Sequence, residues 1–218
     1  MVQKNRETEG KRRGRPRAYD PEAALRQATG AFWKTGYSGT SLDDIAAATG
    51  MNRPSLYAAF GDKHALYLRA LDQYWSLGLA AMHEALAGDR PLREALTDLY
   101  QRALSLYFSG KGRARGCFAI GTATTEAVED PDIRAVFARG LQALDEGFEA
   151  RIRVARDNGE LPGGADPEAL AIMASATLHT IAIRARAGTP RSDLARMAQK
   201  AVDVICGGEQ ASEGPRES

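Results

Sequence analysis

Apolar residues recur at helical spacing along almost the whole chain of 218 residues, and this pattern constrains the fold more than any other feature. Between residues 133 and 155, for example, apolar side chains return every three or four positions and so share one face of a helix. No segment alternates apolar and polar residues between turn signals, as an exposed strand would. The pattern therefore predicts an all-α chain.

Start and stop signals divide this pattern into separate helices. An Asp-Pro pair followed by an acidic residue begins at Asp20, Asp130 and Asp166. The aspartate can accept a free backbone N–H, and proline fits the first helical position because no N–H is needed there. With glycines as the stop signals, these starts predict about nine helices, over residues 21–36, 42–49, 53–60, 63–87, 91–109, 116–129, 131–158, 167–187 and 191–206.

Charge is distributed unevenly, although 29 Lys and Arg against 28 Asp and Glu leave a net charge of only +1. Residues 1–17 hold seven basic and two acidic residues, whereas residues 65–218 hold 18 basic and 21 acidic residues. A basic arm on a slightly acidic body is typical of a nucleic-acid-binding protein that has a second task.

Other classes of protein are disfavoured by what the sequence lacks. The chain shows no apolar signal segment, and its longest uncharged stretch, residues 169–183, is shorter than the ~20 apolar residues of a membrane span. Two cysteines cannot form a disulfide framework or a zinc site alone. No P-loop, nucleophile-elbow or His-Glu-x-x-His motif occurs. We expect a cytoplasmic, nucleoid-associated protein with no catalytic residues, no metal and no cofactor.

Two short predicted helices, over residues 42–49 and 53–60, enclose a turn that contains Gly50. Such a pair is typical of a helix-turn-helix, although a generic helical corner shows the same periodicity. The apolar side chains that would form the inner faces are Leu42, Ile45, Met51, Leu56 and Phe60.

The surrounding residues resemble a known family. The segments Phe-Trp-Lys-Thr-Gly-Tyr (32–37), Thr-Ser-Leu-Asp-Asp-Ile-Ala (40–46) and Ser-Leu-Tyr-Ala-Ala-Phe-Gly-Asp-Lys (55–63) are similar to the DNA-binding signature of the TetR/AcrR family of bacterial transcriptional repressors. The rest of the chain matches that family only in the number and length of its helices. The expected organisation is a disordered basic arm (1–18), a helix-turn-helix domain (19–64), a helical regulatory and dimerisation domain (65–207) and a disordered tail (208–218).

The resemblance implies which residues meet DNA. Arg53 stands at the exposed start of the family's recognition helix, where an arginine can bind O6 and N7 of guanine as a fork. Hydroxyl and N–H groups at the start of the preceding helix can hold a phosphate. The expected contacts are Thr40, Ser41, Arg53, Pro54, Ser55, Tyr57 and Lys63.

The basic arm contains Arg13-Gly14-Arg15-Pro16, which is similar to the core of an AT-hook. Gly and Pro keep such a segment thin and extended, so that Arg13 and Arg15 could enter a narrow, A·T-rich minor groove. The alternative is a basic tail that attracts phosphates without sequence preference.

In this family the larger, C-terminal part binds a small molecule and forms the dimer. We expect a homodimer through residues 167–187 and 191–206, which would place two recognition helices on a palindromic double-stranded operator. A small-molecule effector would favour another spacing of these helices and lower DNA affinity. No charged residue clearly lies on an apolar face, so the ligand should be mostly apolar or neutral. Candidate cavity residues are Tyr74, Trp75, Tyr107, Phe118, Thr124, Phe148, Met173 and His179.

Cys117 opens a predicted helix and follows Lys111, Arg113 and Arg115. Helix N-terminal N–H groups and nearby cations stabilise a thiolate, so that Cys117 could be a redox or electrophile sensor. The Gly-Cys pair resembles a subgroup of TetR-like regulators of which some members sense oxidants. A small apolar side chain packed beneath the helix is the alternative. Two further alternatives for the whole protein are a sensor of this kind without a reversible ligand and a non-specific architectural DNA-binding protein.

Overall fold

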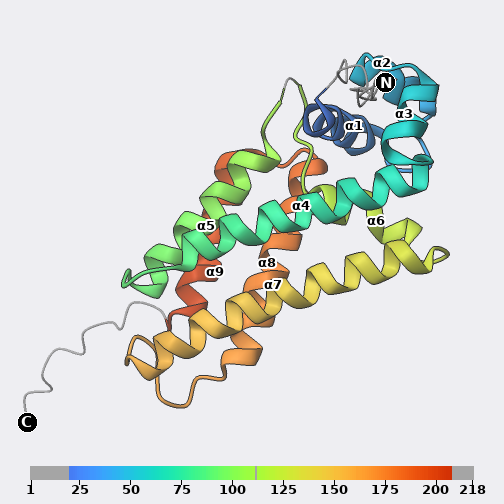
Figure 1. The fold of residues 1–218 in the computed structure, drawn as a ribbon. Coiled ribbons are helices and arrows are strands. Elements are labelled where there is room, and N and C mark those ends of the chain that lie inside the picture. The colour runs from blue at the N-terminus through green and yellow to red at the C-terminus, as the bar shows by residue number, and fades with distance from the viewer. Residues whose placement is uncertain (1–19, 111, 208–218) are drawn as a thin grey trace, which may run out of the picture.

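The computed structural model of the chain describes residues 20–110 and 112–207. The predicted basic arm, with Arg13 and Arg15, and the predicted tail (208–218) lie outside the described residues. Within these residues the fold has nine α-helices and no strand (Figure 1), which confirms the all-α prediction. The helices are α1 (Pro21–Thr35), α2 (Leu42–Thr49), α3 (Arg53–Phe60), α4 (Lys63–Leu86), α5 (Leu92–Tyr107), α6 (Phe118–Glu126), α7 (Pro131–Asp157), α8 (Pro167–Arg186) and α9 (Arg191–Ile205).

The three predicted Asp-Pro starts all cap helices. The side chain of Asp20 accepts the Glu22 N–H at the start of α1. Asp130 and Asp166 each accept two N–H groups at the starts of α7 and α8. These bonds satisfy donors that have no partner inside the helix, and they explain why the sequence located these starts correctly.

Helix α6 is shorter than the predicted range 116–129 at both ends. Gly116 has φ +64°, a left-handed conformation outside the α-helix, and its N–H donates to the Tyr107 carbonyl. After Glu126 the chain forms a turn that leads into the Asp130 cap of α7. The prediction was wrong here because the chain between residues 115 and 118 is held by α5, a contact that periodicity does not report.

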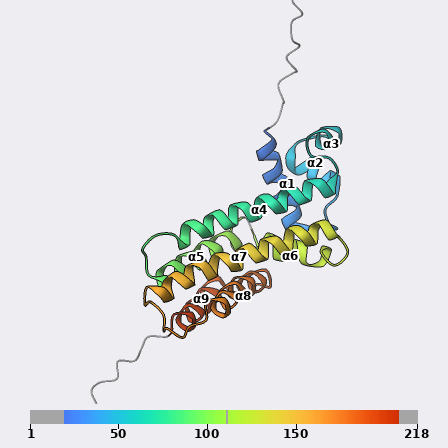
Figure 2. The same ribbon diagram turned by 60° about the horizontal axis from the view of Figure 1, so that its bottom comes forward.

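Helices α1–α3 form a small unit at one end of the molecule, from which α4 runs along the larger part (Figure 1). In that larger part α7 packs against α4 and α8, and α5 packs against α4, α8 and α9. Figure 2 shows α8 and α9 side by side on the side of the molecule away from the small unit. No helix among the described residues is long and apolar enough to cross a membrane.

The small unit is joined to the rest of the molecule by an aromatic cluster. The Phe32 ring of α1 lies 5.1 Å from the Tyr67 ring of α4, and the Trp33 ring lies 5.6 Å from the Phe118 ring of α6. Tyr67 is fully buried and its hydroxyl bonds Thr122 of α6 at 2.7 Å. Burial raises the pKa of Tyr67 to about 12. Helix α1 therefore shares its core with α4 and α6 and does not move independently of them.

The closest approach of α4 and α7 depends on Gly140, which lies against the indole of Trp75. A methyl group at this position would overlap the indole ring atoms. Trp75 belongs to the buried core and also borders an inner cavity, so its displacement by an added methyl would disturb both.

We predict that Gly140→Ala lowers the free energy of unfolding by about 1–3 kcal/mol, because the added methyl overpacks the α4–α7 contact. Urea unfolding followed by circular dichroism measures this. Gly30→Ala in α1 is the matched control, since nothing lies within 4 Å of its added methyl. The control should raise stability slightly through helix propensity. A Gly140→Ala variant as stable as the Gly30→Ala variant would contradict the packing argument.

Candidate nucleic-acid interface and inner cavity

Helices α2 and α3 form the predicted helix-turn-helix. Gly50 ends α2 with φ +65° and ψ +14°, a left-handed conformation that lets the chain reverse. Asn52 then caps α3 by accepting the Ser55 N–H. Ile45, Leu56 and Phe60 are buried on the inner faces, as predicted.

The outer face of α3 carries most of the predicted DNA contacts. Arg53, Pro54 and Tyr57 are exposed and Ser55 is half-buried. Half of the Tyr57 side chain is accessible, which is uncommon for a tyrosine in a small helical unit. The helix thus presents a cation, hydroxyl groups and an aromatic ring to solvent on a single face.

Arg53 is paired with a carboxylate that the sequence reasoning did not identify. Its Nε donates to Asp43 Oδ1 at 2.8 Å and its Nη2 to Asp43 Oδ2 at 2.6 Å. The bond to Arg53 lowers the pKa of Asp43. Opposite charges at the starts of two helices joined by a tight turn were the available sequence signal.

Thr40 and Lys63 both make hydrogen bonds within the protein. Thr40 is buried, and its hydroxyl bonds Thr35 and donates to the Gly36 carbonyl, so the structure does not place it on the outer surface. Lys63 Nζ donates to the carbonyls of Tyr37 and Thr40 at 2.9 Å each. The Lys63 ammonium therefore ties the α1–α2 connection to the start of α4, and these two carbonyl groups occupy two of its three N–H groups.

Ser41 lies on the surface as expected. Its hydroxyl takes part in a capping box, in which it accepts the Asp44 N–H and bonds the Asp44 carboxylate at 2.6 Å. The start of α2 is exposed, and α2 packs against α3.

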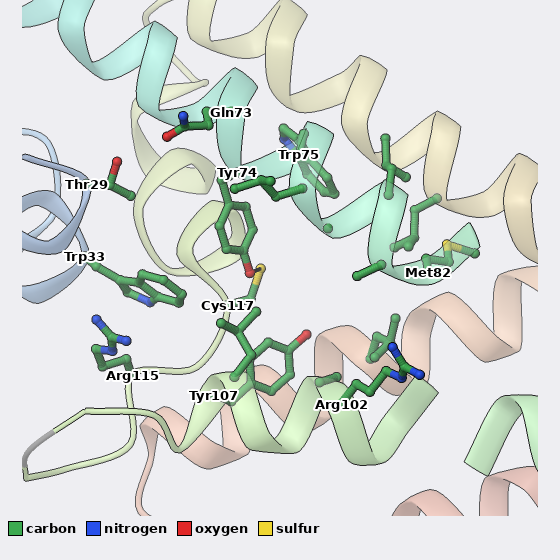
Figure 3. Close-up of a pocket in the computed structure, with 18 of the residues that line it drawn as sticks. Thr29, Trp33, Gln73, Tyr74, Trp75, Met82, Arg102, Tyr107, Arg115 and Cys117 are labelled. Atoms are coloured by element: carbon green, nitrogen blue, oxygen red, sulfur yellow. Dashed lines mark hydrogen bonds between the residues drawn. The ribbon is translucent and has the colours of Figure 1, made fainter. Parts of the chain in front are cut away.

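A cavity of about 550 Å³ lies in the larger part of the molecule, lined by α1, α4, α5, α7, α8 and the segment before α6 (Figure 3). Of the predicted cavity residues, Tyr74, Trp75, Tyr107 and His179 line it, and so does Cys117. Phe118 and Phe148 are instead fully buried in the core, and Thr124 and Met173 are exposed on the surface. The alternation of apolar positions could not separate a cavity wall from the solid core beside it.

Helix α1 contributes to the cavity wall, which the sequence did not suggest. Arg26, Thr29, Gly30 and Trp33 line the cavity from the helix that precedes the helix-turn-helix. Figure 3 shows Thr29 and Trp33 on the α1 side, across from Met82. A molecule in this cavity would therefore touch the small unit directly.

Three arginines also line the cavity, namely Arg26, Arg102 and Arg115, which corrects the expectation of a wall without charge. Carboxylates pair with Arg26 and Arg102. The Arg115 guanidinium stacks on the Trp33 ring at 4.3 Å and donates to Ser109. Within the described part of the chain no carboxylate pairs with Arg115.

Cys117 lies at the centre of the close-up, where the Tyr74 hydroxyl donates to its sulfur at 3.2 Å (Figure 3). Burial raises the pKa of the Cys117 thiol, although Tyr74 and helix N–H groups act in the opposite direction. This burial favours the alternative of a packed side chain over a stabilised thiolate, because desolvation outweighs the hydrogen bonds and Arg115 is turned toward Trp33 and Ser109. Both cysteines are free thiols.

One group of side chains could in principle hold a metal ion. His64 Nε2 lies 2.9 Å from Asp130 Oδ2, and Asp132 is nearby. The other oxygen of Asp130 already caps α7. The arrangement fits a contact between His64 and Asp130 that fastens the start of α4 to the start of α7.

The chain is similar to known proteins along most of its length. The family model for bacterial regulatory proteins of the tetR family matches residues 24–70, and that for the tetracyclin repressor-like C-terminal domain matches residues 93–201. The HTH-type transcriptional repressor ComR of Escherichia coli is 35% identical over 191 residues, which cover 86% of this chain and 90% of ComR. BdcR, a transcriptional repressor of the same organism, is 36% identical over 107 residues, 49% of this chain and 54% of BdcR.

A solved structure gives the same result. A cysteine mutant of the TetR family transcriptional regulator CifR, complexed with 26-base-pair double-strand operator DNA, superposes with a TM-score of 0.78. It is 30% identical and the match covers 86% of this chain and 98% of that of CifR. The nine helices, the helix-turn-helix near the N-terminus and both family matches lead to one conclusion: the chain belongs to the TetR family of bacterial regulatory proteins and is a transcriptional regulator.

Proposed function

We propose that the protein is a repressor that binds a palindromic DNA operator as a homodimer and leaves it when a small molecule occupies the cavity. The observation that carries this proposal is that α1 takes part both in the small DNA-facing unit and in the cavity wall, through Trp33. A ligand that moves Trp33 would change the position of α3. ComR is named a repressor, and CifR was solved with operator DNA, which supports the same role.

The outer face of α3 is the proposed reading surface. Arg53 would contact a guanine, while Ser41, Pro54, Ser55 and Tyr57 would contact phosphates or base edges. Lys63 would place its remaining N–H on a phosphate. Arg13 and Arg15 of the basic arm would enter the minor groove beside each half-site.

Helices α8 and α9 are the proposed dimer interface. Large apolar side chains stay exposed on them, namely Ile172, Met173, Ile183 and Val204. Four helices from two copies would cover these side chains, and the two-fold axis would set the spacing of the recognition helices. We further propose a domain division at residues 19–64 and 65–207, and action by binding without catalysis.

The cavity wall supports a ligand with an apolar body and one group that accepts hydrogen bonds. Aromatic and aliphatic side chains form most of the wall. Arg115, the Tyr107 hydroxyl and the Gln73 amide line the cavity and could donate hydrogen bonds to such a group. Burial lowers the pKa of His179, which favours the neutral imidazole there.

Operator binding tests this proposal directly. DNA sequences bound by the full-length protein would be selected from a random pool and examined for a palindrome. An enriched palindrome is the expected result. Binding that shows no sequence preference would support the architectural alternative instead.

Arg53→Ala should weaken binding to the selected operator by about 1–3 kcal/mol and relax the preference at one position in each half-site. Arg153→Ala on α7 is the matched control, because it removes one exposed cation far along α7 from the helix-turn-helix. Fluorescence anisotropy with operator and random duplexes measures both. An equal loss on the two duplexes would contradict base reading by Arg53.

Removal of residues 1–17 should make operator binding less dependent on salt, because each phosphate contact releases counterions. The slope of log Kd against log salt concentration is the measurement. The paired variants Arg13→Ala/Arg15→Ala and Lys4→Ala/Arg6→Ala remove the same charge. Only the first should lose a preference for A·T-rich flanking sequence, and an unchanged slope after the deletion would show that the arm contributes nothing.

The sensor alternative is tested by the reactivity of Cys117. Because burial raises its pKa, iodoacetamide should alkylate Cys117 more slowly in the native protein than in the urea-unfolded chain. A Cys206→Ser background leaves one thiol to follow by mass spectrometry. Fast native alkylation with release of the operator, both abolished by Cys117→Ser, would support the sensor alternative.

A further inference from the structure

The pair between Asp43 and Arg53 joins the first turns of α2 and α3 on the outer surface of the helix-turn-helix. Two parallel bonds connect the two planar groups, Nε to Oδ1 at 2.8 Å and Nη2 to Oδ2 at 2.6 Å. Such a fork fixes the plane and the direction of a guanidinium, which a single bond does not. Arg53 therefore has one preferred orientation before any DNA arrives.

This orientation leaves a second pair of parallel N–H groups on Arg53 available. A guanidinium has five N–H groups, and Asp43 uses the side formed by Nε and Nη2. The outer N–H groups of Nη1 and Nη2 remain, and they point away from the carboxylate in parallel. Guanine offers two acceptors, O6 and N7, on its major-groove edge, which is the arrangement that two parallel N–H groups match.

The Asp43–Arg53 pair contributes little to the free energy of unfolding. Both side chains are largely exposed, at 55% for Arg53 and 71% for Asp43. Exposed ion pairs contribute little to folding. Asp43 also lies at the positive end of α2, whereas Arg53 lies at the positive end of α3, where a cation is unfavourable without a nearby anion.

We propose that Asp43 is a positioning residue for base recognition, which holds Arg53 so that its free fork meets a guanine and cannot turn to a phosphate. The proposal rests on the proposed function, since it takes α3 as the reading helix. The Asp43 carboxylate also repels the phosphates of the DNA backbone. This repulsion weakens binding to any DNA sequence, and it is offset only where Arg53 bonds a guanine. Asp43 would thus make binding selective at the expense of raw affinity.

The experiment uses the full-length protein and the duplex that the wild-type protein selects from random DNA. Affinities are measured for that duplex, for one with 7-deazaguanine at the guanine read by Arg53, and for a random duplex. The variants are Asp43→Ala, Arg53→Ala and the double variant. Glu22→Gln is the matched control, because it removes another exposed carboxylate from the same small unit.

We expect Asp43→Ala to reduce the discrimination between guanine and 7-deazaguanine by about fivefold or more, the value of a good base contact. The affinity of this variant for random DNA should rise as Arg53 turns to the backbone. The slope of log Kd against log salt concentration should then increase by about the amount expected for one additional phosphate contact. Glu22→Gln should keep the discrimination. In the Arg53→Ala background, Asp43→Ala should have no further effect on discrimination.

Other outcomes separate the two levels of the argument. If neither the wild-type protein nor any variant prefers one DNA sequence over another, the proposed function itself fails. If Arg53→Ala loses the discrimination and Asp43→Ala keeps it, Arg53 reads the base unaided and the positioning role of Asp43 is overturned. If Asp43→Ala lowers the melting temperature and weakens all duplexes equally, Asp43 is a structural residue and the proposal is wrong.

Discussion

The packing of α1 against α4 and α6 is the contact on which the rest of the structure depends. Phe32 and Trp33 bring the first helix of the small unit into the same aromatic core as Tyr67 and Phe118. Because interiors are densely packed, a displacement within this core cannot be absorbed locally. The proposed coupling between the cavity and α3 would run through this set of rings.

The surface of the helix-turn-helix shows how charge is controlled where DNA would bind. Two of the cations that the sequence suggested as contacts lie among the described residues, and both have a protein partner: Arg53 has Asp43, and Lys63 has two carbonyl groups. These partners restrain long side chains that would otherwise lose much conformational freedom on binding. Preorganisation of this kind lowers the entropy cost of binding a matching surface, because only such a surface can use the donors that remain.

Local signals in the sequence located the helices, apart from the two ends of α6, and the inner face of the helix-turn-helix. Asp20, Asp130 and Asp166 cap helices because capping involves only neighbours in sequence. Cavity residues were harder: Tyr74 and Tyr107 line the cavity, whereas Phe148 is core, although all three repeat at helical spacing. Whether an apolar side chain meets another side chain or an empty space depends on helices distant in sequence.

The sequence by itself determined an all-α chain, the nine helices and the family, because caps, periodicity and the helix-turn-helix signature are local. Only the tertiary structure decided the state of Cys117 and the partner of Arg53. Cations that precede Cys117 in sequence suggested a stabilised thiolate, but Arg115 stacks on Trp33 and burial raises the thiol pKa instead. Desolvation and pairing depend on what lies nearby in space, and the order of residues in a chain does not contain that information directly.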